Sequence, residues 1–318
     1  MSLQTFFKQA AFAALLGSAA IAANAQSSGP GGSRPFRVAE RNNVYCAGYV
    51  QSSPIGTDNK VVGAVEEQEQ FNYSQNNLLY INMGAGKGVK AGDVLSVVRP
   101  RGNVETRWTK KDNLGFLVQE VGTVEVVSVK GEVSAVKVKT SCDAILLGDL
   151  VQPFQQRESP IFEQRAALDL FRDPSGKATG RLFMARDGQE MVSREQIVYV
   201  DLGAEDNVKP GDYLTIYRPL GKGHLFISDE KESVAARDEG FQSAEFRGGK
   251  FSNQSARKKG ERAQGRVTTT PDAKKDRPND LRKVVGEAVI LNVKERTATA
   301  VITRTAQEIH TGDWVEIQ

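Results

Sequence analysis

Hydrophobic residues along the chain fall into short runs that have the spacing of β-strands. Leu78 to Met83 and Val94 to Val98 are almost continuously apolar and rich in Val, Ile, Leu and Tyr. Gly122 to Lys139 comes close to alternation with breaks at turns, and Val284 to Thr303 is interpreted in the same way. Short β-branched runs bounded by turn residues are typical of sandwiches and small barrels. The pattern therefore predicts an all-β fold.

Three other segments complete the expected elements. Strands are expected within Asn43 to Val50 and Val61 to Val65. Ser159 to Arg172 has a capping serine followed by proline at the first turn, which favours a helix; the alternative is an irregular linker.

The same pattern occurs twice. Leu78 to Pro100 aligns without a gap to Ile197 to Pro219, at an offset of 119 residues, and ten of the 23 positions are identical. Downstream, Gly122 to Val151 matches Gly286 to Val315 in length and order, at an offset of 164. Two similar blocks in the same order indicate a duplicated module.

A Gly-Asp pair precedes an apolar strand four times. In the clearest case, Lys209-Pro210-Gly211-Asp212, Pro presets the first central position of a type II turn and Gly supplies the positive φ of the next. The Asp side chain is expected to accept backbone N–H groups at the turn exit, so these residues are predicted to be structural turns. They are Gly92, Asp93, Gly148, Asp149, Gly211, Asp212, Gly312 and Asp313.

The N-terminus has the pattern of a secretory signal peptide. Lys8 precedes an apolar run from Ala10 to Ala23, and Ala23-Asn24-Ala25 is a small-x-small cleavage site. Residues 1–25 are thus predicted to be removed, and 26–40, which begin with Ser, Gly and Pro, to form a flexible leader. No later run approaches the length of a membrane span. An exported protein, periplasmic or extracellular, is expected.

Both cysteines, Cys46 and Cys142, lie after the cleavage site. Two cysteines in an oxidising compartment predict one disulfide, which by chain entropy would contribute about 4 kcal/mol; the alternative is two buried free thiols. The second module has no equivalent pair, so the bond would be specific to the first.

The basic charge is concentrated in one segment. Arg247 to Lys283 contains twelve Lys or Arg and four Asp or Glu, whereas the whole chain has a net charge of +3. Residues 221–282 are poor in aliphatic side chains and interrupt the second module, so they are predicted to be a disordered loop. The loop is either a solvated spacer or a contact for an anionic envelope component. Its candidate contacts are Arg257, Lys258, Lys259, Arg262, Lys274 and Lys275.

No set of residues typical of catalysis is present. The two histidines, His224 and His310, form no triad or metal pattern, and His310 is expected to face a turn. Gly84 to Gly88 lacks the Ser or Thr that a phosphate loop needs after its Lys, and Asp206 stands at the place of Lys87 in the second copy. No catalytic, cofactor or metal residues are therefore assigned, and an enzyme is not expected. Nucleic-acid binding is not expected either, because few aromatics accompany the basic charge.

The repeated turn residues are similar to those of a known class of domain. They are Asn82, Gly84, Val89, Gly92, Asp93, Gly122 and Asp149 in the first module, and Asp201, Gly203, Val208, Gly211, Asp212, Gly286 and Asp313 in the second. The pattern resembles the C-terminal domain of the FlgT family of flagellar assembly proteins and the small β-barrel modules of LysM-associated envelope proteins. The resemblance implies SH3-like barrels that act in envelope assemblies without catalysis.

The sequence thus predicts two tandem small SH3-like β-barrel modules, at 41–155 and 156–318, with the insertion in the second. The expected function is an exported, non-enzymatic scaffold or adaptor of the bacterial envelope, whose partners are other envelope proteins. The alternative is a protein that binds peptidoglycan or another cell-wall glycan, with Tyr80, Trp108, Tyr199 and Trp314 as candidate aromatic contacts.

Overall fold

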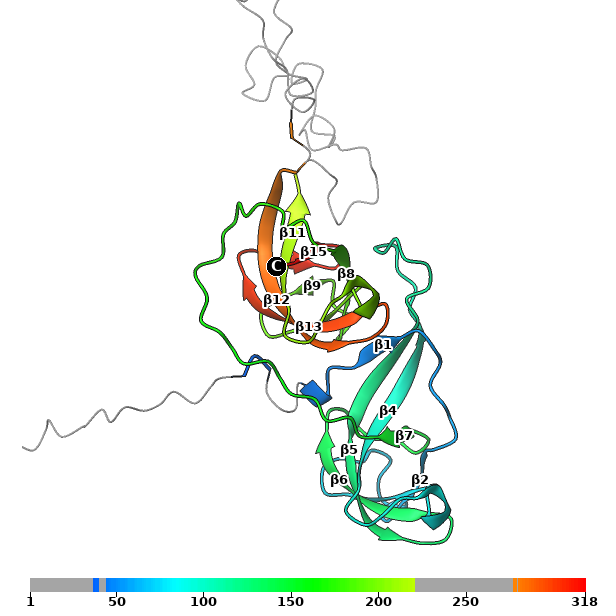
Figure 1. The fold of residues 1–318 in the computed structure, drawn as a ribbon. Helices are drawn as coiled ribbons and strands as arrows, with labels where there is room; N and C mark the ends of the chain where they lie inside the picture. The colour runs from blue at the N-terminus through cyan, green and yellow to red at the C-terminus, as the bar shows by residue number, and fades with distance from the viewer. Residues whose placement is uncertain (1–36, 40–43, 221–276, 279) are drawn as a thin grey trace, which may run out of the picture. The chain divides into compact units, whose positions relative to one another are not determined.

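The computed structural model describes residues 37–39, 44–220, 277–278 and 280–318, which are mainly strands and their connections (Figure 1). The first barrel contains β1 (Tyr49–Gln51), β2 (Val61–Ala64), β3 (Leu78–Ile81), β4 (Val94–Asn103), β5 (Phe116–Val129), β6 (Ser134–Ser141) and β7 (Leu150–Pro153). The second contains β8 (Thr179–Ala185), β9 (Met191–Val192), β10 (Ile197–Val200), β11 (Tyr213–Pro219), β12 (Arg282–Val293), β13 (Ala298–Thr305), β14 (Ile309–His310) and β15 (Trp314–Ile317).

The two barrels have the same strand order. In the second, β10-β13-β12-β11-β15-β8 form a closed barrel. In the first, the path is β2-β3-β6-β5-β4-β7, and β1 pairs with the start of β5. Hydrogen bonds from Val61 N to Asp149 O (2.8 Å) and from Gly148 N to Val61 O (2.8 Å) join β2 to the start of β7 and complete the ring. The predicted all-β fold with two tandem small SH3-like barrels is confirmed.

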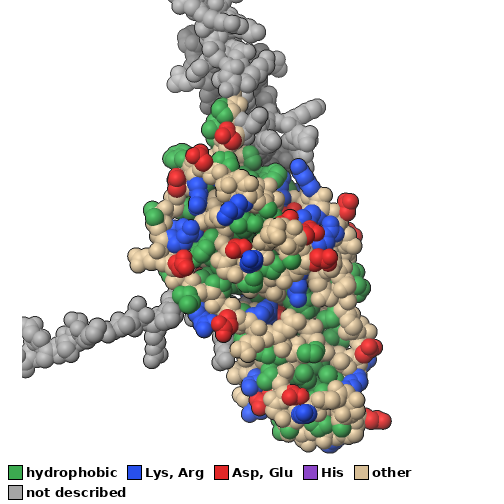
Figure 2. Space-filling model, in the orientation of Figure 1, with side chains coloured by type: hydrophobic (Ala, Val, Ile, Leu, Met, Phe, Trp, Pro, Cys, Tyr) green, Lys and Arg blue, Asp and Glu red, His purple; other side chains and the backbone are tan. Residues whose placement is uncertain are grey.

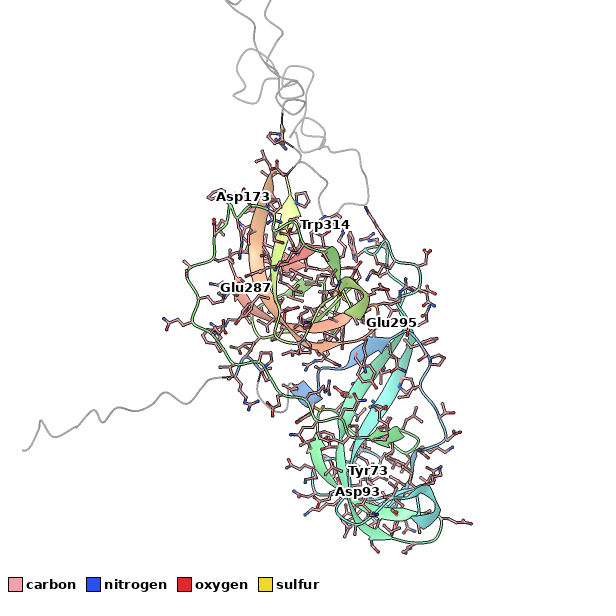
Figure 3. The ribbon with its side chains drawn as sticks, viewed as in Figure 1. Tyr73, Asp93, Asp173, Glu287, Glu295 and Trp314 are labelled. Carbon is pink, nitrogen blue, oxygen red and sulfur yellow. A yellow bond between two sulfur atoms is a disulfide. The ribbon has the colours of Figure 1, made fainter. Side chains whose placement is uncertain are left out.

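The interior of each barrel is filled by equivalent side chains. In the first barrel the core includes Leu79, Ile81, Val126 and Val136. At the same offsets of 119 and 164, the second has Val198, Val200, Ile290 and Ala300. Tyr73, which Figure 3 labels within the first barrel, pairs with Ile145, and their counterparts pair as β9 and β14. The duplication therefore preserves the interior and the pairing.

Two glycines of the repeat are required by close backbone packing. A Cβ on Gly84 would lie 2.2 Å from Gly131 O, and one on Gly203 would lie 2.4 Å from Glu295 O. Each glycine leads into a single 3-10 turn, η1 (Ala85–Lys87) or η2 (Ala204–Asp206). Any other residue would force the backbone apart here, which explains why both copies have glycine.

The four Gly-Asp turns share one geometry. Gly92, Gly148, Gly211 and Gly312 have φ between 91° and 93°, the left-handed value that a type II turn needs. Each Asp carboxylate accepts the N–H of the residue three positions earlier, as Asp212 Oδ2 does from Lys209 N (2.8 Å). The N–H that the Asp carboxylate binds thus lies at the start of the turn, and the prediction that it lies at the turn exit was wrong.

Two of these carboxylates also bind an arginine. Asp149 accepts two hydrogen bonds from Arg99, both at 2.8 Å. Asp313 accepts two from Arg218, at 2.6 and 2.9 Å. A bidentate, partly buried pair of this kind fixes the turn against the neighbouring strand. The Arg-Pro that ends each copy of the first repeat block therefore has a structural role.

Several sequence-based boundaries need correction. Residues 159–172 form no helix; they are an irregular linker that runs beside β12. The predicted flexible leader, residues 26–40, extends too far toward the C-terminus, because Ala39 is buried and its N–H donates to Ser159 Oγ (2.8 Å). The insertion ends earlier than 282, because Arg282 begins β12 and forms a buried pair with Glu316 at 2.5 Å.

Several predictions concern residues outside the described part of the chain. They are the signal peptide at 1–25, the leader up to 36, the loop at 221–276 and all six candidate basic contacts: Arg257, Lys258, Lys259, Arg262, Lys274 and Lys275.

Candidate functional site

The N-terminal segment (residues 37–39 and 44–51) packs on the second barrel before it joins the first as β1. Three of its buried residues, Ala39, Val44 and Ala47, cover Ile197, Val289, Leu291 and Val301 on the outer side of β10, β12 and β13. The second barrel is therefore apolar on both sides of these strands. This contact joins the two barrels.

Side-chain hydroxyls of the second barrel hold this segment in place. Tyr199 Oη donates to Ala47 O (2.8 Å), Thr297 Oγ1 to Val50 O (2.8 Å) and Thr299 Oγ1 to Gly48 O (3.0 Å). Gly48 has φ +68°, and a Cβ here would lie 2.7 Å from Tyr199 Oη. Only glycine allows the segment to approach so closely.

The loop between β4 and β5 (residues 104–115) also reaches the second barrel. Thr109 Oγ1 donates to Asp201 Oδ2 (2.7 Å), and Lys111 Nζ lies 2.5 Å from Glu205 and 2.6 Å from Asp206. Trp108 packs where Gly312 leaves room, since a Cβ there would lie 2.7 Å from its ring. The β4–β5 loop occupies the place in the first module that the long insertion occupies in the second.

The disulfide fixes the N-terminal segment to the first barrel. Cys46 and Cys142 are bonded, with a Cα–Cα distance of 5.5 Å, and Cys142 directly follows β6. The predicted disulfide is confirmed. It places the one covalent cross-link of the chain at the junction of the barrels.

A buried carboxylate lies at the same junction. Glu120 on β5 accepts from Gly48 N (3.0 Å) and is paired with Arg157 of the linker. Burial raises the pKa of Glu120 above its ordinary value, against the opposing effects of Arg157 and Lys294. Burial also lowers the pKa of Lys294, whose ammonium lies 4.2 Å from the Tyr49 ring. These groups order the junction, since each charge has a partner from another segment.

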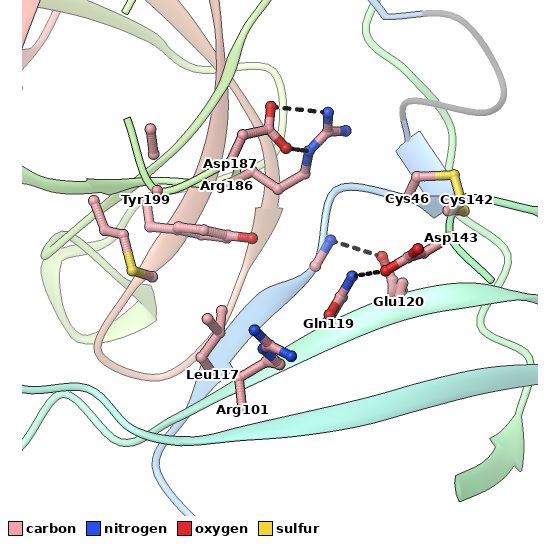
Figure 4. Close-up of a pocket in the computed structure, with 14 residues that line it drawn as sticks. Cys46, Arg101, Leu117, Gln119, Glu120, Cys142, Asp143, Arg186, Asp187 and Tyr199 are labelled. Atoms are coloured by element: carbon pink, nitrogen blue, oxygen red, sulfur yellow. Dashed lines mark hydrogen bonds and ion pairs between the residues drawn. A yellow bond between two sulfur atoms is a disulfide. The ribbon is translucent and has the colours of Figure 1, made fainter. Parts of the chain in front are cut away.

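A cleft of about 540 Å³ opens beside this cluster (Figure 4). Its lining includes the disulfide, and Gln119 Nε2 donates to Asp143 Oδ2 at 2.9 Å. Arg186 donates twice to Asp187, at 2.9 and 3.1 Å, and burial raises the pKa of Tyr199. The acidic groups are engaged, and the phenol is held protonated.

The described residues also contain no metal cluster of three or more His, Cys, Asp or Glu side chains. No helix within the same ranges is long and apolar enough to cross a bilayer. Lys, Arg, Asp and Glu side chains are interspersed over the face shown in Figure 2.

The candidate aromatics are largely used in packing. Tyr199 is buried, and Trp108 lies at the junction. The Arg181 guanidinium lies 3.9 Å from the centre of the Trp314 ring, and Lys130 lies 5.7 Å from that of Tyr80. Tyr199 is thus not open for stacking against a sugar, and a basic side chain lies over the rings of Trp314 and Tyr80.

The remaining candidates are dispersed. Lys87 is exposed on η1 and donates to Asn59 Oδ1 (2.6 Å), and His310 is buried in β14, with its N–H bonded to Asp313. The structure brings neither residue into the cleft.

One surface without a role in packing is apolar. On the outer side of the first barrel, Val62 lies on β2 and Val65 directly follows it, Leu78 and Tyr80 lie on β3, and Val127 lies on β5. We refer to these five residues as the outer face. Val65, Leu78 and Val127 are 57%, 42% and 54% exposed, and Tyr80 is half-buried. The sequence carries a signal for it, because Val126 and Val127 are adjacent where alternation requires a polar residue.

A scan against protein-family models found no match for this chain. A search of the curated proteins found no match either.

Proposed function

We propose that this protein is an exported, non-enzymatic scaffold or adaptor of the bacterial cell envelope. It holds two barrels in one unit and presents the outer face of the first barrel to a protein partner. The observation that carries the proposal is the contrast between equivalent surfaces. The second barrel's outer side is covered by the N-terminal segment, whereas on the same side of the first barrel the apolar Leu78 and Val127 are exposed.

The chemistry of the chain supports this assignment. Exposed apolar side chains among polar ones are typical of protein-binding sites. The disulfide and the signal-peptide pattern support an oxidising, exported location. The similarity of the turn pattern to envelope barrel domains fits the same class of function.

The glycan-binding alternative requires exposed aromatic platforms. The candidate rings are buried or lie beside cations, so the geometry favours a protein partner. Sedimentation of the mature protein with purified peptidoglycan separates the two functions. A scaffold stays in the supernatant, and quantitative co-sedimentation would support the glycan function instead.

Proximity labelling in the native envelope tests the scaffold directly. The wild type should label a defined set of envelope proteins, and Leu78→Asp should lose that set while folding normally. Met191→Asp is the matched control, because Met191 is also exposed but lies on β9, away from the outer face. Labelling of bulk periplasmic proteins alone, by wild type and variants equally, would contradict the proposal.

A further inference from the structure

The contact between the two barrels has a donor side and an acceptor side. The first module donates the N-terminal segment and the end of the β4–β5 hairpin, including Leu117. The second module accepts them on Met184, Ile197, Tyr199 and Leu291. Because the modules are duplicates, each side has an equivalent on the other module.

The equivalent of the acceptor side is the outer face. At the offsets of 119 and 164, Ile197 corresponds to Leu78, Tyr199 to Tyr80 and Leu291 to Val127. Val289 and Val301, which the N-terminal segment also covers, correspond to Glu125 and Lys137. Met184 pairs with Tyr199 as Gly63 pairs with Tyr80, so its counterpart has no side chain. Leu78 and Val127 are exposed, and Tyr80 is half-buried beside Lys130. Ile197 is 2% exposed, in contrast to Leu78. The first module thus keeps three apolar or aromatic positions of the docking surface, next to two positions that have become charged.

The equivalent of the donor side lies at the end of the β11–β12 hairpin. Leu220 and Leu281 correspond to Arg101 and Leu117, and Leu220 N donates to Leu281 O (2.9 Å). Beside them the linker runs along β12 as β1 runs along β5, with Leu170 O accepting from Val284 N (3.1 Å).

Its exposed apolar side chains form a second patch. Leu170, Phe171, Leu220 and Leu281 are all exposed, Phe171 at 86%, and we refer to these four as the hairpin-end patch. Asp173, labelled in Figure 3, lies next to it, since its carbonyl accepts from Arg282 Nη2 (2.5 Å).

Some of the charges around the two surfaces are opposite in sign. Within the chain, Lys111 of the donor side meets Glu205 and Asp206 on η2. On the first barrel the position of Asp206 is held by Lys87, which reverses the sign. Three exposed carboxylates, Asp169, Asp173 and Asp280, accompany the hairpin-end patch. Opposite charges at the rim of a contact favour encounter and fix its register.

We propose that copies of this chain associate head to tail, with the hairpin-end patch of one copy docked on the outer face of the next. The contact repeats between molecules the arrangement that joins the two barrels within one molecule. The contact is heterologous, because it joins two different surfaces. A pair of docked copies therefore keeps one free outer face and one free hairpin-end patch, and further copies can add to form chains or closed rings. The inference rests on the scaffold function and names a second copy as the partner of the outer face.

The test measures the molar mass of the purified mature chain by sedimentation velocity over a concentration series up to about 1 mM, the range of weak specific contacts. The wild type should grow in mass with concentration. Leu78→Asp, which lacks a usable outer face, and Leu281→Asp, which lacks a usable hairpin-end patch, should each stay monomeric. A mixture of the two should form a heterodimer and nothing larger, because one intact surface of each kind remains. Met191→Asp should behave as the wild type.

Three results would overturn the inference. The first is a monomeric wild type at every concentration. The second is a dimer that persists in Leu281→Asp but is lost in Leu78→Asp, which indicates a symmetric contact between two outer faces. The third is a mixture that fails to pair although both variants retain the wild-type thermal transition. These results can be told apart from failure of the scaffold function. If the wild type is monomeric but its envelope labelling still depends on Leu78, the outer face binds a partner other than a second copy. If the chain assembles but labels no specific envelope proteins, the scaffold function fails.

Discussion

β5 and β12 occupy the same place in two copies of one fold, yet only one of them is buried on both sides. On β5, Glu125 is half-buried and Val127 is exposed. On β12, their counterparts Val289 and Leu291 are fully buried beneath the N-terminal segment. The duplication has kept the inside of the barrel and changed the outside. The specific properties of the two modules therefore lie on their outer surfaces.

The largest effect should follow loss of the disulfide, which only the first module has. Replacing both Cys46 and Cys142 by Ser should lower the free energy of unfolding by about 4 kcal/mol, because the cross-link restricts the unfolded chain over a long loop. It also releases the segment that covers the second barrel. Urea unfolding with a fluorescence readout measures the change. An unaltered midpoint would mean that the junction does not depend on the bond.

A matched pair of truncations tests the difference between the covered and the exposed outer sides. Ile197→Ala should cost about 3 kcal/mol, because it opens a cavity under the N-terminal segment, whereas Leu78→Ala should cost less than about 1 kcal/mol. Both values come from urea unfolding of the monomer. Equal losses at the two positions would show that the two sides are packed alike.

A polar position on the same strands sharpens the comparison. Glu287 on β12, labelled in Figure 3, lies 2.7 Å from Arg165 and from Arg304 and also accepts from Gln318 Nε2 (2.9 Å). Glu287→Gln should cost about 2 kcal/mol through loss of charge-assisted hydrogen bonds.

The equivalent residue on β5 is the control for that substitution. Thr123 shares one hydroxyl hydrogen bond with Thr140 (2.7 Å), so Thr123→Val should cost about 1 kcal/mol. Thermal unfolding of both variants provides the comparison. A larger loss for Thr123→Val would contradict the view that the linker is anchored through Glu287.

The smallest effect concerns pH. Because burial raises the pKa of Glu120, the folded chain keeps this proton at pH values where the unfolded chain has released it. Its contribution to stability is thus full below the ordinary glutamate pKa and is lost as pH rises through the raised one. The difference in unfolding free energy between the wild type and Glu120→Gln should therefore fall as pH rises across that range. A difference that rises with pH would show that the Arg157 pairing dominates instead.

Much of the fold could be predicted from the sequence because local rules govern it. The Gly-Asp turns need a positive φ that glycine supplies, and the repeat fixes which strands correspond. The bidentate partners of Asp149 and Asp313 could not be found in this way, because Arg99 and Arg218 reach them only after strands have paired.

The outer surfaces were harder to predict than the interior. The interpretation of Val284 to Thr303 as alternating was wrong: the run from Val284 to Leu291 is buried throughout, the pattern of a strand covered on both sides. The residues that cover it, Ala39, Val44 and Ala47, lie more than two hundred residues earlier, and nothing in the local pattern there indicates this contact. The capped start at Ser159 instead serves the linker, since the Ser159 hydroxyl accepts from Ala39 N.

Hydroxyl-radical footprinting of the dilute wild-type protein tests most directly whether the two copies differ in which outer side is covered. Leu78, Tyr80 and Val127 should be oxidised much faster than their counterparts Ile197, Tyr199 and Leu291, and the difference should vanish in denaturant. Matched rates in the native monomer would contradict the account, because they would mean that the outer sides of the two barrels are equally open.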